Sequence, residues 1–211
     1  MKTLFRLLAL VAVIATPFAL SHSAQAEKTE KFVQDIAIVE HYLQGLTSAR
    51  ARFVQTTHDG TQLVGTFYLQ RPGKLRFEYD DPIKDFVVAD GVFIYFYDAE
   101  LGEQSNAPIG QTLADFILRK DVSLSKDVIV ESIRRKGDLL QVTLVQESDP
   151  TAGSLTLGFD EDPLTLKKWR VVDGQGLITE VELFYLKTDI KHPNDLFVYA
   201  APDGGETNYN E

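Results

Sequence analysis

The chain has 211 residues, 44% of them hydrophobic and 25% charged, a composition typical of a globular protein with its own core. Its 31 acidic and 21 basic residues give a formal net charge of −10, which argues against nucleic acid as a partner. The sequence contains no cysteine, which excludes a disulfide framework, a thiolate metal site, a thiol nucleophile and an acceptor for a lipid anchor.

The first 26 residues have the pattern of a secretory signal peptide. Lys2 and Arg6 provide the basic start, an apolar run follows at residues 7–20, and residues 24–26 provide the small side chains of a cleavage site. No later run reaches the roughly 18 apolar residues that a membrane-spanning helix needs. We therefore expect secretion, cleavage after Ala26 and release of the mature chain.

The mature chain is predicted to begin with one helix and to continue mainly as strands. An amphipathic helix is expected at residues 29–46, because apolar side chains recur there at every third or fourth position. His58-Asp59-Gly60 and Lys136-Gly137-Asp138 are typical hairpin turns, so most neighbouring strands are expected to pair antiparallel. Strands are predicted near residues 49–57, 61–70, 74–79, 85–89, 92–97, 128–135, 139–145, 154–159, 165–172, 177–187 and 196–199.

The segment at residues 65–98 carries more aromatic surface than so short a stretch can hide. Leu75, Phe77 and Tyr79 alternate with charged residues, the period of a strand with one apolar and one wet face. Asp90-Gly91 predicts a type I′ hairpin turn that places the next aromatic strand nearby. Another part of the chain is expected to cover this surface.

The insertion at residues 100–127 is too long for a hairpin loop. It contains a short predicted helix at residues 112–118, with Leu113, Phe116 and Ile117 on one side. Glycine and proline precede this helix, so we expect a mobile lead-in. The insertion is predicted to cross the sheet as a covering loop.

These elements predict an α+β protein with a single domain at residues 27–202 and a disordered polar tail at residues 203–211. One twisted antiparallel sheet of about 11 strands tends to curl. The expected fold is an incomplete, half-open antiparallel β-barrel whose concave apolar face is covered by α-helices. Between the helices and the sheet lies either a packed core or a cavity.

The sequence shows no recognisable catalytic or metal-binding motif. It lacks a nucleophile elbow, a phosphate-binding loop, a dinucleotide fingerprint and a zinc-binding histidine pair. The acidic turns Asp80-Asp81-Pro82 and Asp160-Glu161-Asp162-Pro163 lack the glycine and distal glutamate of a calcium loop. We therefore expect a binding protein with no catalytic residues, no metal and no cofactor.

Apolar side chains from the aromatic strands and the inserted helix are the candidates for lining a cavity. Periodicity alone favours their packing on one another as an ordinary core, and the single tryptophan, Trp169, is expected in that core. The candidates are Phe67, Leu69, Leu75, Phe77, Tyr79, Phe93, Tyr95, Leu113, Phe116 and Ile117.

Several residues of the aromatic segment and just before it form a recognisable pattern. They are Phe53, Gln55, Gly65-x-Phe67-x-Leu69-x-Arg71-Pro72-x-x-Leu75-x-Phe77-x-Tyr79, Val87-Val88-x-Asp90-Gly91 and Tyr97-Asp98. This pattern resembles the signature of the LolA family, the periplasmic carriers of outer-membrane lipoproteins. The likeness extends loosely over residues 27–202 and is specific between Phe53 and Asp98. It implies a half-closed antiparallel barrel with a helical lid over an apolar cavity.

The resemblance also implies a function and partners. Such a carrier binds the acyl chains of triacylated lipoproteins that an ATP-driven complex releases from the inner membrane. It delivers them to a lipid-anchored receptor on the outer membrane. By this resemblance we expect a monomer in the periplasm that shelters acyl chains from water.

Arg71 matches the family arginine whose guanidinium hydrogen-bonds backbone carbonyls of the lid. An always-charged group with several donors suits a latch that holds the lid over an empty cavity. Pro72 is expected to hold the Arg71 end of the strand in place, because proline fixes φ and lacks an N–H. The alternative is an exposed arginine at a strand end with no such role.

Two other functions remain open from the sequence. The half-barrel could bind another amphiphile, such as a free lipid or glycolipid, without transporting lipoproteins, because apolar side chains do not distinguish acyl chains by what is attached to them. It could also be an enzyme of envelope lipids with an unrecognised Ser or Asp centre.

Overall fold

The structure is a computed structural model that describes residues 20–112, 114–126 and 128–200. Residues 1–19 of the predicted signal peptide, the predicted lid residue Leu113 and the predicted tail at residues 203–211 lie outside the described residues. The chain divides into two units, Met1–Gln34 and Asp35–Glu211.

The described part of the first unit is helical. Helix α1 (Leu20–Gly45) begins in this unit and ends in the second one. The helix predicted at residues 29–46 is therefore confirmed, although it starts earlier than the apolar periodicity indicates. Across the described residues, none of the helices combines the length and the apolar character needed to cross a membrane.

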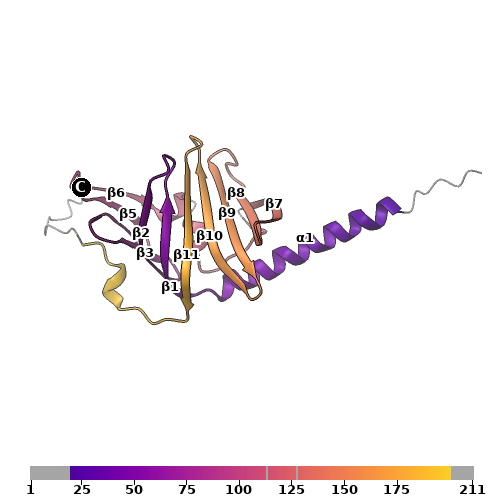
Figure 1. The fold of residues 1–211 in the computed structure, drawn as a ribbon, viewed down its shortest axis with the longest axis horizontal. Coiled ribbons are helices and arrows are strands. Elements are labelled where there is room, and N and C mark those ends of the chain that lie inside the picture. Colours follow the sequence, from indigo (N-terminus) through magenta and orange to yellow (C-terminus); the bar gives the residue numbers. More distant parts are fainter. Residues whose placement is uncertain (1–19, 113, 127, 201–211) are drawn as a thin grey trace, which may run out of the picture. The chain divides into compact units, whose positions relative to one another are not determined.

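The second unit is built on one antiparallel sheet of eleven strands (Figure 1). Ten of the eleven strands coincide with predicted ones, because their apolar residues alternate with polar residues or form short apolar runs. The strands are β1 (Ser48–Thr56), β2 (Gln62–Gln70), β3 (Lys74–Tyr79), β4 (Phe86–Asp90), β5 (Phe93–Asp98), β6 (Glu103–Pro108), β7 (Val128–Lys136), β8 (Leu139–Gln146), β9 (Gly153–Glu161), β10 (Leu164–Asp173) and β11 (Ile178–Thr188).

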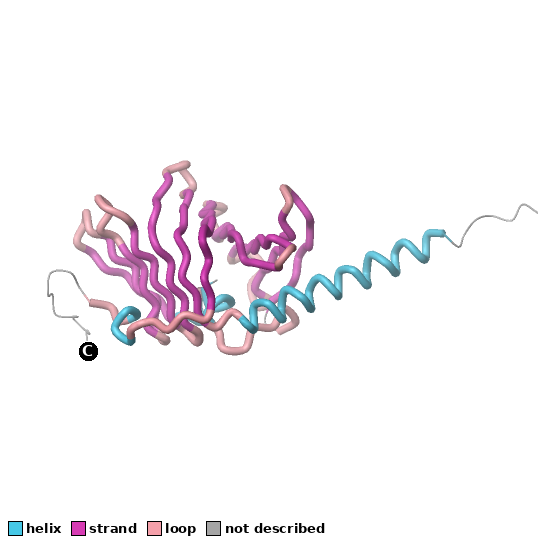
Figure 2. The backbone as a smooth tube through the Cα atoms, turned by 60° about the horizontal axis from the view of Figure 1, so that its bottom comes forward, coloured by secondary structure: helices cyan, strands magenta, loops and turns pink. Residues whose placement is uncertain are grey.

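The strands lie in the order β6-β5-β4-β3-β2-β1-β11-β10-β9-β8-β7. The chain thus forms two meanders that meet where β1 pairs with β11, with Phe53 opposite Leu183. Among the described strands, β6 and β7 have one neighbour each, so the sheet does not close. Figure 2 shows the strands side by side in a curved sheet. The predicted half-open antiparallel barrel is confirmed.

Alternating side chains place the core on one face of the sheet. In β8 the buried residues Leu140, Val142 and Leu144 alternate with Gln141 and Thr143, and most other strands follow the same period of two. We call the face that carries the main buried cluster the inner face and the opposite one the outer face. A smaller buried cluster, formed by Phe86, Val88 and Tyr97, packs with Tyr199 on the outer face. The hydrophobic core lies against the inner face.

Short helices cover part of the inner face. After β6 the chain forms the 3-10 helix η1 (Ile109–Gln111) and helix α2 (Ala114–Leu118), which we call the lid. Phe116 and Leu118 of the lid are buried in the same cluster as the inner side chains of the sheet. Val39 and Leu43 from the second half of α1 belong to that cluster as well.

One strand was not predicted from the sequence, and one predicted strand does not form. The start of the insertion forms the edge strand β6, which pairs with β5, and not a mobile lead-in. Its residues are mostly exposed, so backbone hydrogen bonds hold the strand and no apolar period marks it in the sequence. No strand forms at the predicted residues 196–199, because residues 196 and 197 lie in the 3-10 helix η2 (Asn194–Phe197) and residues 198 and 199 belong to no helix or strand.

The turn at Asp90-Gly91 also differs from the prediction. A type I′ turn needs positive φ at both central residues, but here φ is positive at Gly91 alone, at 115°. The Asp90 carboxylate accepts hydrogen bonds from the N–H groups of Val92 (2.8 Å) and Phe93 (2.9 Å). A side chain therefore stabilises this turn in place of a second left-handed residue.

Candidate functional site

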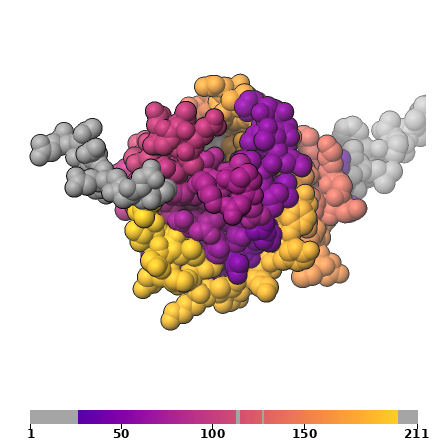
Figure 3. Space-filling model, turned by 60° about the vertical axis from the view of Figure 1, so that its left-hand side comes forward, coloured from indigo at the N-terminus to yellow at the C-terminus, as the bar shows by residue number. Residues whose placement is uncertain are grey.

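An apolar hollow of about 360 Å³ lies between the inner face of the sheet and the lid. Figure 3 shows the surface recessed between the indigo side chains of the early strands and the magenta side chains further along the chain. Apart from Gln55, Thr112 and Thr179, the side chains that line it are aliphatic or aromatic. The lining residues are Gln55, Phe67, Leu75, Phe77, Tyr79, Val87, Ile94, Phe96, Thr112, Ile117, Leu155, Trp169, Val171, Thr179 and Val181.

Aromatic rings from two distant parts of the chain form one wall of the hollow. The ring centroid of Phe67 lies 5.0 Å from that of Phe77 and 5.4 Å from that of Trp169. The Phe77 and Trp169 rings are 6.1 Å apart in an edge-to-face arrangement, a favourable geometry for aromatic pairs. Trp169 is only 7% exposed, so it packs in the core as predicted and also lines the hollow.

The predicted cavity residues divide into four groups. Five of them line the hollow, namely Phe67, Leu75, Phe77, Tyr79 and Ile117. Leu69 and Phe116 are buried in the surrounding core, with exposed fractions of 1% and 4%, and do not line it. Leu113 lies outside the described residues.

The predicted placement of Phe93 and Tyr95 in the hollow is wrong. Their neighbours on β5, Ile94 and Phe96, line it instead. Tyr95 stacks on Tyr199 on the other side of the sheet, with ring centroids 4.9 Å apart. Because nearly every residue of this strand is apolar or aromatic, alternation in the sequence does not reveal which set faces inward.

The C-terminal strands contribute lining residues that were not among the cavity candidates predicted from the sequence. Leu155 on β9, Trp169 and Val171 on β10, and Thr179 and Val181 on β11 face the hollow. Their period of two was visible in the predicted strands. What was missing was the pairing of β1 with β11, which brings the two halves of the chain around one space.

One polar pair lies within the mostly apolar lining. The hydroxyl group of Tyr79 donates a hydrogen bond to Oε1 of Gln55 at 2.9 Å. Burial raises the pKa of Tyr79 to about 12, so this hydroxyl stays protonated near neutral pH. The pair places an amide group beside the hollow without a charge.

Arg71, in the turn after β2, connects the lid with α1. Its Nε donates to the carbonyl oxygen of Ile117 in the lid at 2.5 Å, and its Nη1 donates to the carbonyl oxygen of Leu43 near the end of α1. The last carbonyl groups of a helix lack intrahelical donors, so one guanidinium group completes the ends of two helices. The lid contact that the resemblance implies for Arg71 is present in the structure.

The environment of Arg71 is poorly hydrated. Burial lowers the pKa of Arg71 to about 10, because water no longer solvates the cation. Its Nη2 is buried and has no hydrogen-bond partner among the described residues. The closed arrangement therefore leaves part of the cost of burying this group uncompensated.

The turn that carries Arg71 is itself bound to the lid. The N–H group of Gly73 donates to the carbonyl oxygen of Leu118 at 2.8 Å. Gly73 has a φ of +76°, and a Cβ atom there would lie 2.7 Å from the Cα of Gly91. The exposed Pro72 occupies the corner between the two lid-binding residues. Only glycine fits at position 73 without a shift of the neighbouring hairpin.

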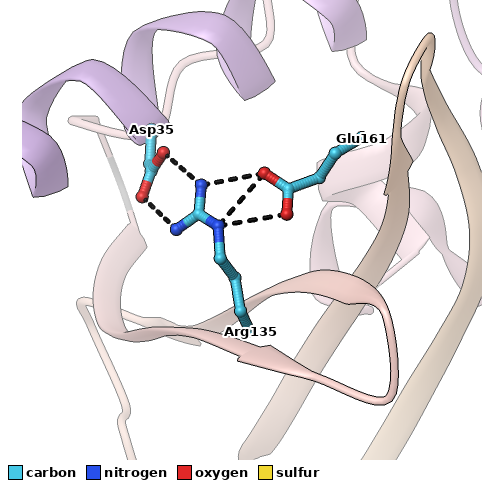
Figure 4. Close-up of polar contacts among 3 residues, drawn as sticks. All are labelled: Asp35, Arg135 and Glu161. Carbon is cyan, nitrogen blue, oxygen red and sulfur yellow. Dashed lines mark hydrogen bonds and ion pairs between the residues drawn. The ribbon is translucent and has the colours of Figure 1, made fainter.

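A second group of polar contacts attaches α1 to the other half of the sheet (Figure 4). Arg135 on β7 donates to both carboxylate oxygens of Asp35 on α1, at 2.9 Å each, and to the carboxylate of Glu161 on β9 at 2.9 to 3.1 Å. These hydrogen bonds, first those to Asp35 and then those to Glu161, raise the pKa of Arg135. Asp35 is thus bound directly to β7 and, through Arg135, is linked to β9.

Side chains further along α1 bind the segment that follows the lid. The carboxylate of Glu40 accepts a hydrogen bond from the N–H group of Leu124 at 2.7 Å, and Nε2 of Gln44 donates to the carbonyl oxygen of Val122 at 3.1 Å. Helix α1 is therefore linked to the lid through Arg71 and to the segment after the lid through Glu40 and Gln44. Within the described residues, no group of three or more His, Asp or Glu side chains is placed to hold a metal ion.

A half-open antiparallel barrel with an apolar hollow under a hydrogen-bonded lid defines a class of proteins that shelter apolar ligands. Residues 44–200 match the family model described as "Outer membrane lipoprotein carrier protein LolA". The chain belongs to the LolA family, and the resemblance seen in the sequence is confirmed.

Individual relatives share modest identity over most of their length. An outer-membrane lipoprotein carrier protein of Legionella pneumophila (strain Paris) is 30% identical over 185 residues, covering 83% of this chain and 90% of the relative. The protein of the same name from Methylibium petroleiphilum is 28% identical over 179 residues, covering 81% and 87%. A solved structure of a LolA superfamily protein from Nitrosomonas europaea aligns with a TM-score of 0.43 and 8% identity over 78% of this chain and 97% of that one.

Proposed function

We propose that this protein carries lipoproteins through the periplasm with their acyl chains sheltered in the apolar hollow. The observation that carries the proposal is the hollow itself, an apolar space of about 360 Å³ in a member of a carrier family. Each methylene group that leaves water contributes about 0.8 kcal/mol, so an acyl chain of ordinary length resists crossing water by roughly 10 kcal/mol. Apolar walls remove most of that barrier.

The size of the hollow indicates that the described state is the closed one. Pockets for small ligands usually measure about 300 to 1,000 Å³, so about 360 Å³ is near the lower limit. Three acyl chains need more space than this. Cargo loading therefore requires the lid to move away from the sheet.

Arg71 stabilises the closed, empty state, which therefore competes with the loaded state. Its two hydrogen bonds to the carbonyl groups of Ile117 and Leu43 exist only while lid and helix stay in place. Breaking them on loading costs free energy that is recovered on release, so cargo is held less tightly than in a membrane. We call this arrangement the Arg71 latch.

The delivery route follows from the family. We propose that an ATP-driven complex of the inner membrane loads the protein, and that a lipid-anchored receptor on the outer membrane unloads it. We also propose that residues 1–26 direct export and are removed after Ala26. The protein acts as a monomer, since one chain holds both the hollow and the latch.

Trp169 provides the direct test of binding, because it is the only tryptophan and lines the hollow. A triacylated lipopeptide should shift its emission, whereas the same peptide without acyl chains should not. Val171→Phe fills part of the hollow with apolar atoms and should weaken lipopeptide binding about tenfold. Val64→Phe, on an exposed position of β2, is the matched control and should leave binding within about twofold.

Two results would overturn the proposal. If Trp169 emission does not change when the acylated peptide is added, the hollow is not an acyl-chain site. Binding of free fatty acid, together with normal departure of lipoproteins from the inner membrane after depletion of the protein, would instead favour an amphiphile-binding module without transport.

A further inference from the structure

The outer face of the sheet carries a polar groove of about 430 Å³ that spans β7, β8, β9 and β10. This groove lies on the opposite side of the sheet from the hollow, because its residues alternate with the buried ones. On β8, for example, Gln141 and Thr143 line the groove while Val142 is fully buried. What binds here does not compete with the hollow for space.

Cationic side chains form both walls of the groove. Arg134 and Lys136 project from β7, and Lys168 and Arg170 from β10. The two strands are separated by three strand spacings, or about 14 Å at about 4.8 Å per spacing. A positive groove of this kind is unexpected in a chain with a net charge of −10.

These cations are only partly neutralised by neighbouring carboxylates. Lys168 pairs with Glu180 of β11 at 3.3 Å between Nζ and Oε1. Within the described residues, Arg134, Lys136 and Arg170 form no ion pair of 4 Å or less. The wall on β7 is therefore a pair of exposed, uncompensated positive charges.

The floor between the walls is made of small or neutral residues. The hydroxyl groups of Thr143 and Thr156 are hydrogen-bonded to each other at 3.0 Å, which leaves one hydroxyl hydrogen to donate outward. Beside them Gly158 has no side chain, and a Cβ there would lie 3.1 Å from Cγ of Lys168. The floor thus leaves space for a ligand between the two rows of cations and provides one hydroxyl group that can donate a hydrogen bond to it.

The surroundings of the groove favour a narrow ligand over an extended anionic surface. The turns at both ends carry exposed acidic residues, Asp138 and Asp162 at the end that holds the β7–β8 and β9–β10 turns, and Glu147 and Asp149 in the β8–β9 turn at the other end. At a Debye length of about 10 Å these carboxylates repel a membrane surface or a nucleic acid that covers the whole face. An extended polypeptide is narrow enough to lie between the acidic turns, and its charged side chains then reach only the cationic walls.

We propose that this groove is a docking site for a short acidic segment of a partner protein. Carboxylate side chains of the segment pair with Arg134 and Lys136 on one wall and with Arg170 on the other, and the floor hydroxyl donates to them. A partner held on the outer face leaves the lid and the hollow free to open. The inference does not depend on what the hollow binds.

The probe for this site is a fluorescein-labelled peptide of alternating Glu and Ser, measured by anisotropy with the mature chain. The peptide should bind, its affinity should fall as salt rises, and a Lys-Ser peptide should not bind. The double variant Arg134→Glu/Lys136→Glu should weaken binding at least about tenfold. Lys120→Glu/Lys191→Glu changes the net charge equally at exposed positions elsewhere and should weaken it less than about twofold.

Trp169 emission monitors folding in both double variants, because Trp169 faces the other side of the sheet. Absence of peptide binding by the unaltered protein overturns the proposal, as does an equal loss in the two double variants. Binding of phosphatidylglycerol vesicles that the Arg134→Glu/Lys136→Glu variant alone loses would identify the groove as a lipid-surface site and would also overturn it.

Discussion

The guanidinium group of Arg135 donates to both carboxylate oxygens of Asp35, with both N···O distances at 2.9 Å. Asp35 is only 5% exposed, whereas the side chain of Arg135 is 37% exposed. A two-bond contact to a buried carboxylate fixes direction as well as distance. This pair therefore fixes the position of α1 at Asp35 relative to strand β7.

Removing the cation should destabilise the fold. Arg135→Ala leaves the Asp35 carboxylate buried without its bidentate donor, so we expect the free energy of unfolding to fall by about 3 kcal/mol in urea titrations. Arg134→Ala is the control one residue away, on the exposed face, and should change it by less than about 0.5 kcal/mol. Equal effects of the two variants would show that the contact with Asp35 is not stabilising.

The latch makes a prediction about release of cargo. Arg71→Leu should fold normally but should release a triacylated lipopeptide to acceptor vesicles about tenfold more slowly, because the closed state no longer competes with cargo. Stopped-flow measurement of Trp169 emission gives the rate. Arg50→Leu, on the exposed side of β1, is the control and should release at the normal rate. An unchanged rate in Arg71→Leu would contradict the latch.

Gly73 should tolerate no side chain. Gly73→Ala combines a φ of +76° with a Cβ placed 2.7 Å from the Cα of Gly91, and we expect a loss of about 3 kcal/mol in the free energy of unfolding. Gly60→Ala separates the two causes. Gly60 has a φ of +86° and open space around it, so only the conformational cost of about 1 kcal/mol applies. Similar losses at the two positions would mean that the close approach is relieved at little cost.

Tyr79 should contribute to stability in a way that depends on pH. Its pKa is about 12 in the folded protein and near 10 in an unfolded chain, so the folded state holds the proton more tightly. The contribution is fully present below about pH 10 and is lost as the pH rises through about 12. Tyr79→Phe should remove this part of the alkaline loss of stability, whereas Tyr185→Phe, at an 85% exposed position, should not. The measurement is the urea midpoint across that range, and identical profiles would contradict the assignment.

Local sequence patterns were sufficient for most elements of the fold. Strand periodicity and turn residues located ten of the eleven strands and α1, because burial on one face of a strand or helix leaves a repeat in the sequence. Strand β6 and the 3-10 helix η2 were not predicted. An exposed edge strand carries no apolar period, and an apolar stretch after Asn194 could not be told from a strand until the sheet around it was complete.

The candidate site was less accessible from the sequence. The motif around Arg71 pointed to the lid, and five of the ten proposed cavity residues line the hollow. Phe93 and Tyr95 were assigned to the wrong face, since a strand of nearly continuous aromatic and aliphatic residues gives no alternation to read. Gly73, whose N–H group binds Leu118, was visible only as a turn residue.

The amino-acid sequence by itself determined that this is a cysteine-free half-barrel of the LolA family with an aromatic segment and an arginine suited to hold a lid. Only the tertiary structure decided that the aromatic side chains border an open space and that Trp169 and Val181 from the other end of the chain complete its walls. The reason is physical. Periodicity records whether a side chain avoids water, and a filled core and an empty hollow satisfy that condition equally, whereas the distance between two walls depends on the long-range pairing of β1 with β11.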